Sequence, residues 1–211
     1  MNTAPSSPTY VFKGKKIDRK QFDQLFRDNE TLVIANGGAV EHGTLGLYLS
    51  EDDLVADLKG TPSGDAVAKV REGARKLLMD QAKENEKVLA ARHQKEDERV
   101  TKEYLRLSKE TGLPHDSPEL LQKAIDARII NSAILFEHIN YGGAWRLVGK
   151  GNLSWIGFND KTSSFRMILS VGFLAEHANF FGRKYWTFGL NFSDPDLRNA
   201  NFNDIASSVW L

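Results

Sequence analysis

The 211-residue sequence contains no cysteine, which excludes disulfide bonds, thiolate metal sites and cysteine nucleophiles. It also lacks an excess of either charge, because 28 basic residues balance 28 acidic ones. This balance argues against a nucleic-acid-binding protein, whose affinity depends mainly on surplus Lys and Arg. No stretch approaches the apolar run of about twenty residues that spans a bilayer. We therefore expect a soluble protein that binds no nucleic acid and does not span a membrane.

The N-terminus has no positive patch followed by an apolar segment, as a secretory leader would have. We expect either a cytoplasmic protein or an exported one whose leader is absent from this sequence. Residues 1–9 are rich in Pro, Ser and Thr, and this composition predicts a disordered leader.

Residues 10–60 have the pattern of a small α+β module. Asp18, followed three residues later by Gln21, predicts the capped start of a helix. Three apolar runs, YVFKG, TLVIA and TLGLYL, predict strands. Ser50 predicts the N-cap of a second helix, which Gly60 ends.

Residues 61–131 predict a helical segment, which begins with one long helix over residues 64–112. The long helix is predicted because Ala, Glu, Lys, Arg, Leu and Gln dominate this range and no proline interrupts it. The charge run at residues 83–99 predicts a solvated face. Because its apolar stripe is weak, such a helix either packs at its ends or binds a protein partner through a partner helix. Ser117 and Pro118 then predict the start of a second helix, which runs to about residue 130.

Residues 132–211 predict an all-β domain, because aromatic residues, Gly, Asn and Ser replace the helix formers. Two patterns recur there in the same order. The first is Glu-His-x-Asn-aromatic-x-Gly, at Glu137–Gly143 and Glu176–Gly182. The second is Phe-Asn-Asp-x-x-Ser-Ser, at Phe158–Ser164 and Phe202–Ser208. Two ordered patterns at nearly equal spacing predict two similar β units that pack face to face.

The second pattern concentrates oxygen atoms that bind hard cations. Each copy carries one Asp carboxylate, one Asn amide and at least two hydroxyls within six residues. Ca²⁺ prefers such ligands, whereas zinc favours histidine and thiolate. A single copy would be interpreted as side chains that hydrogen-bond the turn backbone. Two copies with the same upstream pattern favour calcium.

These motifs resemble the microbial βγ-crystallins over roughly the last eighty residues. In that family each of two Greek-key motifs has an aromatic-x4-aromatic-x-Gly hairpin and a calcium signature, Asn/Asp-Asn/Asp-x-x-Ser/Thr-Ser. Phe136, Tyr141 and Gly143 match the first hairpin, and both Asn-Asp-x-x-Ser-Ser segments match the signature. Ala175 departs from the pattern, because the second hairpin of the family begins with an aromatic residue.

The resemblance implies a βγ-crystallin-like Greek-key sandwich that holds two Ca²⁺ ions, each shared between the motifs. For one ion it implies the backbone carbonyls of Glu137 and Lys161, the hydroxyl of Ser163 and the carboxylate of Asp204. For the other it implies Glu176, Ile205, Ser207 and Asp160 in the same roles. The expected fold class is thus α+β multidomain, with a small N-terminal module, a helical segment and this sandwich.

We therefore expect a non-enzymatic calcium-binding protein whose ions stabilise the C-terminal domain. The alternative is a secreted protease inhibitor or protein-binding module, since some small secreted βγ-crystallin-like proteins inhibit proteases. An enzyme with its site in residues 10–60 has only a glycine-rich turn in its favour. His138 and His177 predict hydrogen-bonded turn histidines rather than metal ligands. The four tryptophans are predicted to form the core of the β sandwich: Trp145, Trp155, Trp186 and Trp210.

Overall fold

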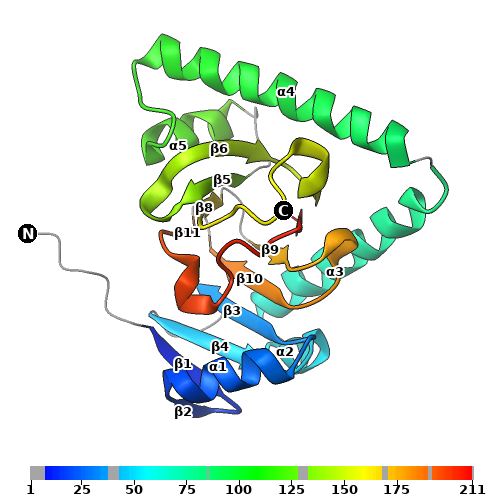
Figure 1. Ribbon diagram of the computed structural model, residues 1–211, viewed down its shortest axis with the longest axis vertical. Helices are drawn as coiled ribbons and strands as arrows, with labels where there is room; N and C mark the ends of the chain where they lie inside the picture. The colour runs from blue at the N-terminus through cyan, green and yellow to red at the C-terminus, as the bar shows by residue number, and fades with distance from the viewer. Residues whose placement is uncertain are drawn as a thin grey trace, which may run out of the picture.

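A computed structural model describes residues 8–37, 43–84, 86–127, 133–167, 171–189 and 192–210. Most of the predicted leader lies outside these residues, and Thr9 already belongs to the first strand. No helix within the described ranges combines the length and the apolar character that crossing a membrane requires. The described elements form an α+β fold with two β-sheets, which confirms the predicted fold class (Figure 1).

The N-terminal elements form a small sheet with one helix on each face. They are β1 (Thr9–Phe12), β2 (Lys15–Ile17), α1 (Arg19–Asp28), β3 (Val33–Gly37), β4 (Thr44–Tyr48) and α2 (Glu51–Asp57). Ile34 of β3 belongs to the same buried cluster as Phe22 of α1. The next residue, Ala35, belongs instead to the cluster that contains Leu54 of α2. Because successive strand residues point to opposite faces, α1 and α2 cover opposite sides of the sheet.

Both predicted helix starts in this module are confirmed. Asp18 accepts a hydrogen bond from the N–H of Gln21, and the Gln21 side chain accepts one from the N–H of Asp18. This reciprocal pair satisfies two backbone donors that the first helical turn leaves unpaired. The Ser50 hydroxyl accepts a single hydrogen bond from the N–H of Asp53 and caps the start of α2.

The helical segment is interrupted where the sequence predicts continuity. Two helices, α3 (Pro62–Gln81) and α4 (Glu86–Thr111), replace the long helix predicted over residues 64–112, so that prediction is wrong. After α3, the N–H of Lys83 bonds to the carbonyl of Asp80, a three-residue spacing tighter than that of an α-helix. The break lets α3 and α4 pack against different sheets.

A third helix, α5 (Pro118–Asp126), completes the segment. The Ser117 hydroxyl accepts a hydrogen bond from the N–H of Leu120, as expected of the predicted N-cap. The helix ends at Asp126, before the predicted end, and residues 128–132 lie outside the described part of the chain.

The C-terminal strands form two interleaved four-strand motifs. The strands are β5 (Ala133–His138), β6 (Gly142–Val148), β7 (Gly151–Asn152), β8 (Ser164–Met167), β9 (Val171–Ala175), β10 (Lys184–Phe188), β11 (Ser193–Asp194) and β12 (Ser208–Trp210). Short 3-10 helices connect them: η1 (Ile139–Tyr141), η2 (Leu153–Ile156), η3 (Ala178–Phe180) and η4 (Leu197–Ala200). In each motif the first two strands form a hairpin and the fourth pairs with the first. The third strand crosses to the other motif, so β11 pairs with β8 and β7 with β12.

The N-terminal sheet continues directly into one of these sheets. β3 pairs in parallel with β10, from Val33 opposite Lys184 to Gly37 opposite Phe188. The result is an eight-stranded sheet of order β2-β1-β4-β3-β10-β9-β12-β7. The second sheet has the order β11-β8-β5-β6. Figure 1 shows the blue strand β3 side by side with the orange strand β10.

Buried side chains fill three layers. The largest cluster lies between the two sheets and includes Leu135, Phe165 and Phe202. α3 covers the outer face of the eight-stranded sheet through Val67 and Ala74. α4 and α5 cover the outer face of the second sheet in a cluster with these buried members: Tyr104, Leu120, Leu121, Ala124, Ile134, Phe136 and Leu147.

The four tryptophans lie between sheets and helices, not in the predicted sandwich core. Trp186 and Trp210 are buried in the α3 layer. Trp145 stacks on His115, with ring centroids 4.9 Å apart, and Trp155 lies against His93 of α4, also at 4.9 Å. The helices make this possible because they cover sheet faces that water would otherwise contact.

The charge run at residues 83–99 forms the predicted solvated face, because every described charged side chain in it except Asp97 is exposed. One side of this stretch nevertheless packs against the β region. His93 packs on Trp155. Burial, together with the neighbouring Glu96, raises the pKa of Asp97 to about 7, although a hydrogen bond with the Gly149 backbone opposes the rise. The charged middle of α4 therefore faces the β region along one side.

Candidate metal centres between the two motifs

The two Asn-Asp-x-x-Ser-Ser loops have the same local conformation. Asp160 and Asp204 both adopt left-handed backbone angles, with φ of 53° and 56°. The side-chain amide of Asn159 donates to Asp160 Oδ2, and that of Asn203 donates to Asp204 Oδ2, each at 2.6 Å. Asn and Asp tolerate this conformation better than other residues with a Cβ. The repeated residues therefore produce a repeated geometry.

The loops bind each other reciprocally across the motifs. The N–H of Asp160 donates to the carbonyl of Ala206 at 3.0 Å, and the N–H of Asp204 donates to the carbonyl of Thr162 at 2.9 Å. Each Asp side chain therefore lies beside the loop of the opposite motif.

The first predicted ligand set comes together around Ser163. Its Oγ lies 2.7 Å from the backbone carbonyl oxygen of Glu137 and 2.9 Å from Asp204 Oδ1. Lys161, the fourth predicted residue, directly precedes Thr162. The backbone carbonyl of Thr162 accepts a hydrogen bond from the N–H of Asp204. Three oxygens from three distant segments therefore converge beside the backbone of Lys161.

The second predicted set is arranged similarly but is less complete. Ser207 Oγ lies 3.0 Å from Asp160 Oδ1, and the N–H of Ser207 donates to the carbonyl of Ala175. Among the described contacts, none joins Ser207 Oγ to the carbonyl of Glu176. The Glu176 carboxylate instead forms an ion pair with Arg183. Ile205 is half-buried against the core between the sheets, in the middle of the same loop.

The last serine of each signature fixes the upstream hairpin. Ser164 Oγ donates to the carbonyl of His138 at 2.7 Å and accepts from the N–H of Tyr141 at 3.0 Å. Ser208 Oγ repeats this with the carbonyl of His177 at 2.6 Å and the N–H of Phe180 at 3.0 Å. The two sequence patterns recur together because the last serine of the second pattern binds the backbone of the first.

The electrostatic character of both sites is that of a hard-cation site with little charge. Asp160 and Asp204 are exposed, whereas Ser163 and Ser207 are buried. Within the described residues, no group of three or more His, Asp or Glu side chains is placed to hold a metal ion. Each candidate site thus offers one carboxylate and otherwise neutral oxygens, which Ca²⁺ accepts and zinc does not favour.

Sequence reasoning missed Arg183, which connects Glu176 to the N-terminal module. Its guanidinium donates to the carbonyl of Phe26 at 2.7 Å and lies 4.1 Å from the centroid of the Phe26 ring. The residue is one position beyond the repeated Glu-His-x-Asn-aromatic-x-Gly pattern, where the first copy has Ala144. This difference between the two copies is the sequence feature that could have indicated a special role for Arg183.

No protein-family model matches the chain, and no curated protein matches it. Among solved structures, the chain is similar to the βγ-crystallin from Ciona intestinalis, at 27% identity over 37% of this chain and 96% of that one, with a TM-score of 0.34. It is similar to a βγ-crystallin from an archaeon at 24% identity over 37% and 94% of the two chains, with a TM-score of 0.33. A βγ-crystallin domain from Clostridium beijerinckii has 29% identity over 37% and 94%, with a TM-score of 0.32. By their own order and pairing, the strands from β5 to β12 form a Greek-key sandwich of the βγ-crystallin-like type.

Proposed function

We propose that the chain is a non-enzymatic calcium-binding protein whose Greek-key sandwich binds two Ca²⁺ ions between its paired motifs. The first ion would be held by Glu137, Lys161, Ser163 and Asp204. The second would be held by Glu176, Ile205, Ser207 and Asp160. When bound, each ion supplies positive charge that joins oxygen atoms of both motifs.

The observation that carries this proposal is the oxygen arrangement around Ser163. Its hydroxyl is within hydrogen-bond distance of two acceptors, the carbonyl of Glu137 and the carboxylate of Asp204. A hydroxyl has one proton, so it satisfies only one of these acceptors at a time. A cation placed among the three oxygens would satisfy all of them at once, because each has a lone pair available.

Calcium binding of this kind would stabilise the folded chain. An ion that binds only the folded state adds about 2.7 kcal/mol at a hundredfold excess over its Kd. Sites with a single carboxylate lie toward the weaker end of protein calcium sites, so we expect binding no tighter than Kd values of roughly micromolar to tens of micromolar. The ions would then tie the two motifs together.

A calorimetric Ca²⁺ titration of the chelator-stripped protein tests the proposal. The informative variants are Asp160→Asn and Asp204→Asn, because Asn preserves the left-handed backbone and nearly the same shape while removing the charge. Asp80→Asn, at an exposed position of α3, serves as the matched control. We expect two ions to bind the parent and the control, and each loop variant to lose most of the affinity of one site.

Two results would overturn the proposal. One is a parent that gives no binding heat and melts at the same temperature with and without calcium. The other is full binding by both loop variants. The alternative of a secreted protease inhibitor stays a prediction, for which inhibition of a protease panel is the measurement.

A further inference from the structure

The two signature loops begin at equivalent positions that carry different residues. Gly157 ends η2 with φ of 68°, and Asn201 ends η4 with φ of 54°. In both, the N–H of this left-handed residue bonds back into the 3-10 helix. Glycine adopts the conformation without strain, whereas asparagine adopts it at some cost. The second loop therefore accepts a less suitable backbone residue and gains a side chain there.

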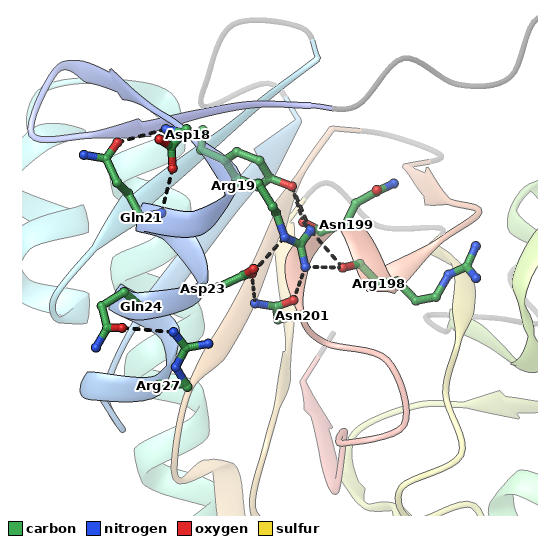
Figure 2. Close-up of polar contacts among 10 residues, drawn as sticks. Asp18, Arg19, Gln21, Asp23, Gln24, Arg27, Arg198, Asn199 and Asn201 are labelled. Carbon is green, nitrogen blue, oxygen red and sulfur yellow. Dashed lines mark hydrogen bonds and ion pairs between the residues drawn. The ribbon is translucent and has the colours of Figure 1, made fainter.

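That side chain binds helix α1 of the N-terminal module. Asn201 Oδ1 accepts a hydrogen bond from Arg19, and Asn201 Nδ2 donates to Asp23 Oδ1 at 2.8 Å. Arg19 Nε also forms an ion pair with Asp23 Oδ1 at 2.8 Å. The three side chains make a closed triangle, in which every member is held by the other two (Figure 2).

Arg19 holds the turn before Asn201 as well. Its guanidinium donates to the carbonyls of Arg198 and Asn199, at 3.2 and 3.1 Å. The same group donates to the hydroxyl of Tyr10, which in turn donates to the carbonyl of Asn199. Figure 2 shows the side chain of Arg19 reaching from α1 into this turn. One residue of the module thus fixes the backbone that leads directly into the second signature.

The other end of α1 is connected to Glu176 through Arg183. The carbonyl of Phe26 accepts a hydrogen bond from Arg183, and the same guanidinium pairs with the Glu176 carboxylate. Glu176 belongs to the second proposed ligand set. Helix α1 therefore restrains both the 201–207 loop and the segment around Glu176, through contacts near its two ends.

We propose that the N-terminal module positions the calcium-binding loop, so that calcium affinity and the docking of α1 are coupled. This inference rests on the proposed function. The loop would supply Asp204 to one ion and both Ile205 and Ser207 to the other. A loop held in place by α1 loses less conformational freedom when an ion binds, which raises affinity. By reciprocity, calcium tightens the docking of α1 by the same factor.

The test compares variants of two arginines on the same helix. Arg19→Gln removes the contacts with the loop. Arg27→Gln is the matched control, because the described contact of Arg27 is with Gln24 of the same helix (Figure 2). Asn201→Gly is the second informative variant, since it installs the residue of the first copy, eases the backbone and removes only the side-chain bonds to α1.

The measurements are Ca²⁺ affinity by calorimetry and hydrogen exchange of the α1 amides with and without calcium. We expect Arg19→Gln and Asn201→Gly each to weaken calcium binding about fivefold or more, the usual lower bound for coupled sites. Both should lose the slowing of α1 exchange that calcium produces in the parent. The variant that carries both Arg19→Gln and Asn201→Gly should bind calcium no more weakly than the weaker of the two single variants. Arg27→Gln should match the parent in both measurements.

Folded variants that bind calcium with the affinity of the parent would overturn the coupling while leaving the calcium proposal intact. A parent that binds no calcium would overturn both. Far-ultraviolet circular dichroism establishes folding. Asn201→Gly is expected to fold even if Arg19→Gln does not, because the first motif already uses glycine at this position.

Discussion

At the scale of single residues, the environment of a side chain decides its chemistry more than its type does. Asp97 lies on a helix full of exposed carboxylates, yet burial and Glu96 raise its pKa to about 7 from 3.8. In the unfolded chain this group releases its proton near pH 4. Between about pH 4 and pH 7 the folded chain therefore binds more protons than the unfolded chain. Its contribution favours folding at low pH and disappears as the pH rises through that window.

We expect Asp97→Asn to raise the free energy of unfolding at pH 8, where the parent must bury a charge, and to leave it nearly unchanged at pH 4. Urea denaturation at the two pH values measures this difference. Glu98→Gln, which removes a carboxylate from an exposed position on the same helix, is the matched control. An equal effect of Asp97→Asn at both pH values would contradict the interpretation.

The site residues that belong to the repeat could be predicted from the sequence, whereas those outside it could not. The repeat marks Asp160, Ser163, Asp204 and Ser207, because local backbone chemistry imposes the same residues on both copies. Arg19 belongs to no repeated pattern, since its role depends on a contact with residues about 180 positions away. Its partner Asn201 was detectable only as a departure from Gly157 between otherwise matching copies.

At the scale of secondary-structure elements, helix starts are predictable and the break in the long helix is not. The caps at Asp18 and Ser50 are local, because each side chain binds a backbone group three residues away. The break between α3 and α4 has only a weak local signal, the single Asn at position 85 just before α4 begins. Helix formers flank it on both sides, and the two helices that it separates pack on different sheets. Propensity does not report where a packing surface ends.

The packing of Gly73 in α3 against Trp210 in β12 leads to a prediction at this scale. Gly73 lies inside α3, where alanine is the better helix former by about 1 kcal/mol. A Cβ at that position would lie 2.7 Å from Cζ2 of the buried Trp210 ring. We expect Gly73→Ala to destabilise the protein despite its propensity, because α3 would have to shift away from the sheet. Urea unfolding followed by tryptophan fluorescence measures this.

Glu72→Ala, at the exposed neighbouring position, is the control and should be neutral or slightly stabilising. Stabilisation by Gly73→Ala of the same size as the control would show that the Trp210 ring moves aside freely.

At the scale of the whole molecule, the N-terminal module and the sandwich share one sheet and one buried polar chain. Tyr185 of β10 donates to Asp194 of β11 at 2.6 Å and accepts from Asn36 of β3 at 2.5 Å. Burial raises the pKa of Asp194, so the carboxylate depends on these partners. The sequence predicts a strand at TLVIA, which overlaps β3, and an all-β domain over residues 132–211. Strand pairing between distant segments has no local signal, so the continuous sheet could not be predicted.

We expect this shared sheet to make unfolding a single cooperative transition. All four tryptophans lie at or after residue 145, so their fluorescence reports on the C-terminal region, whereas hydrogen exchange of residues 33–35 reports on the module. The two probes should give coincident urea midpoints. A module that exchanges freely at urea concentrations where the tryptophans remain native would contradict this expectation.

The parallel pairing of β3 with β10 also determines the order in which the chain can complete its fold during synthesis. Val33 and Lys184 are about 150 residues apart, and the ribosome adds roughly 5–20 residues per second. Strand β3 therefore waits on the order of ten to thirty seconds with one edge unpaired. Such an edge is a template for pairing with other chains, so newly made protein is exposed to aggregation until β10 has been synthesised. Slower translation would lengthen that exposure, and a chaperone that covers strand edges would act on this protein before β10 arrives.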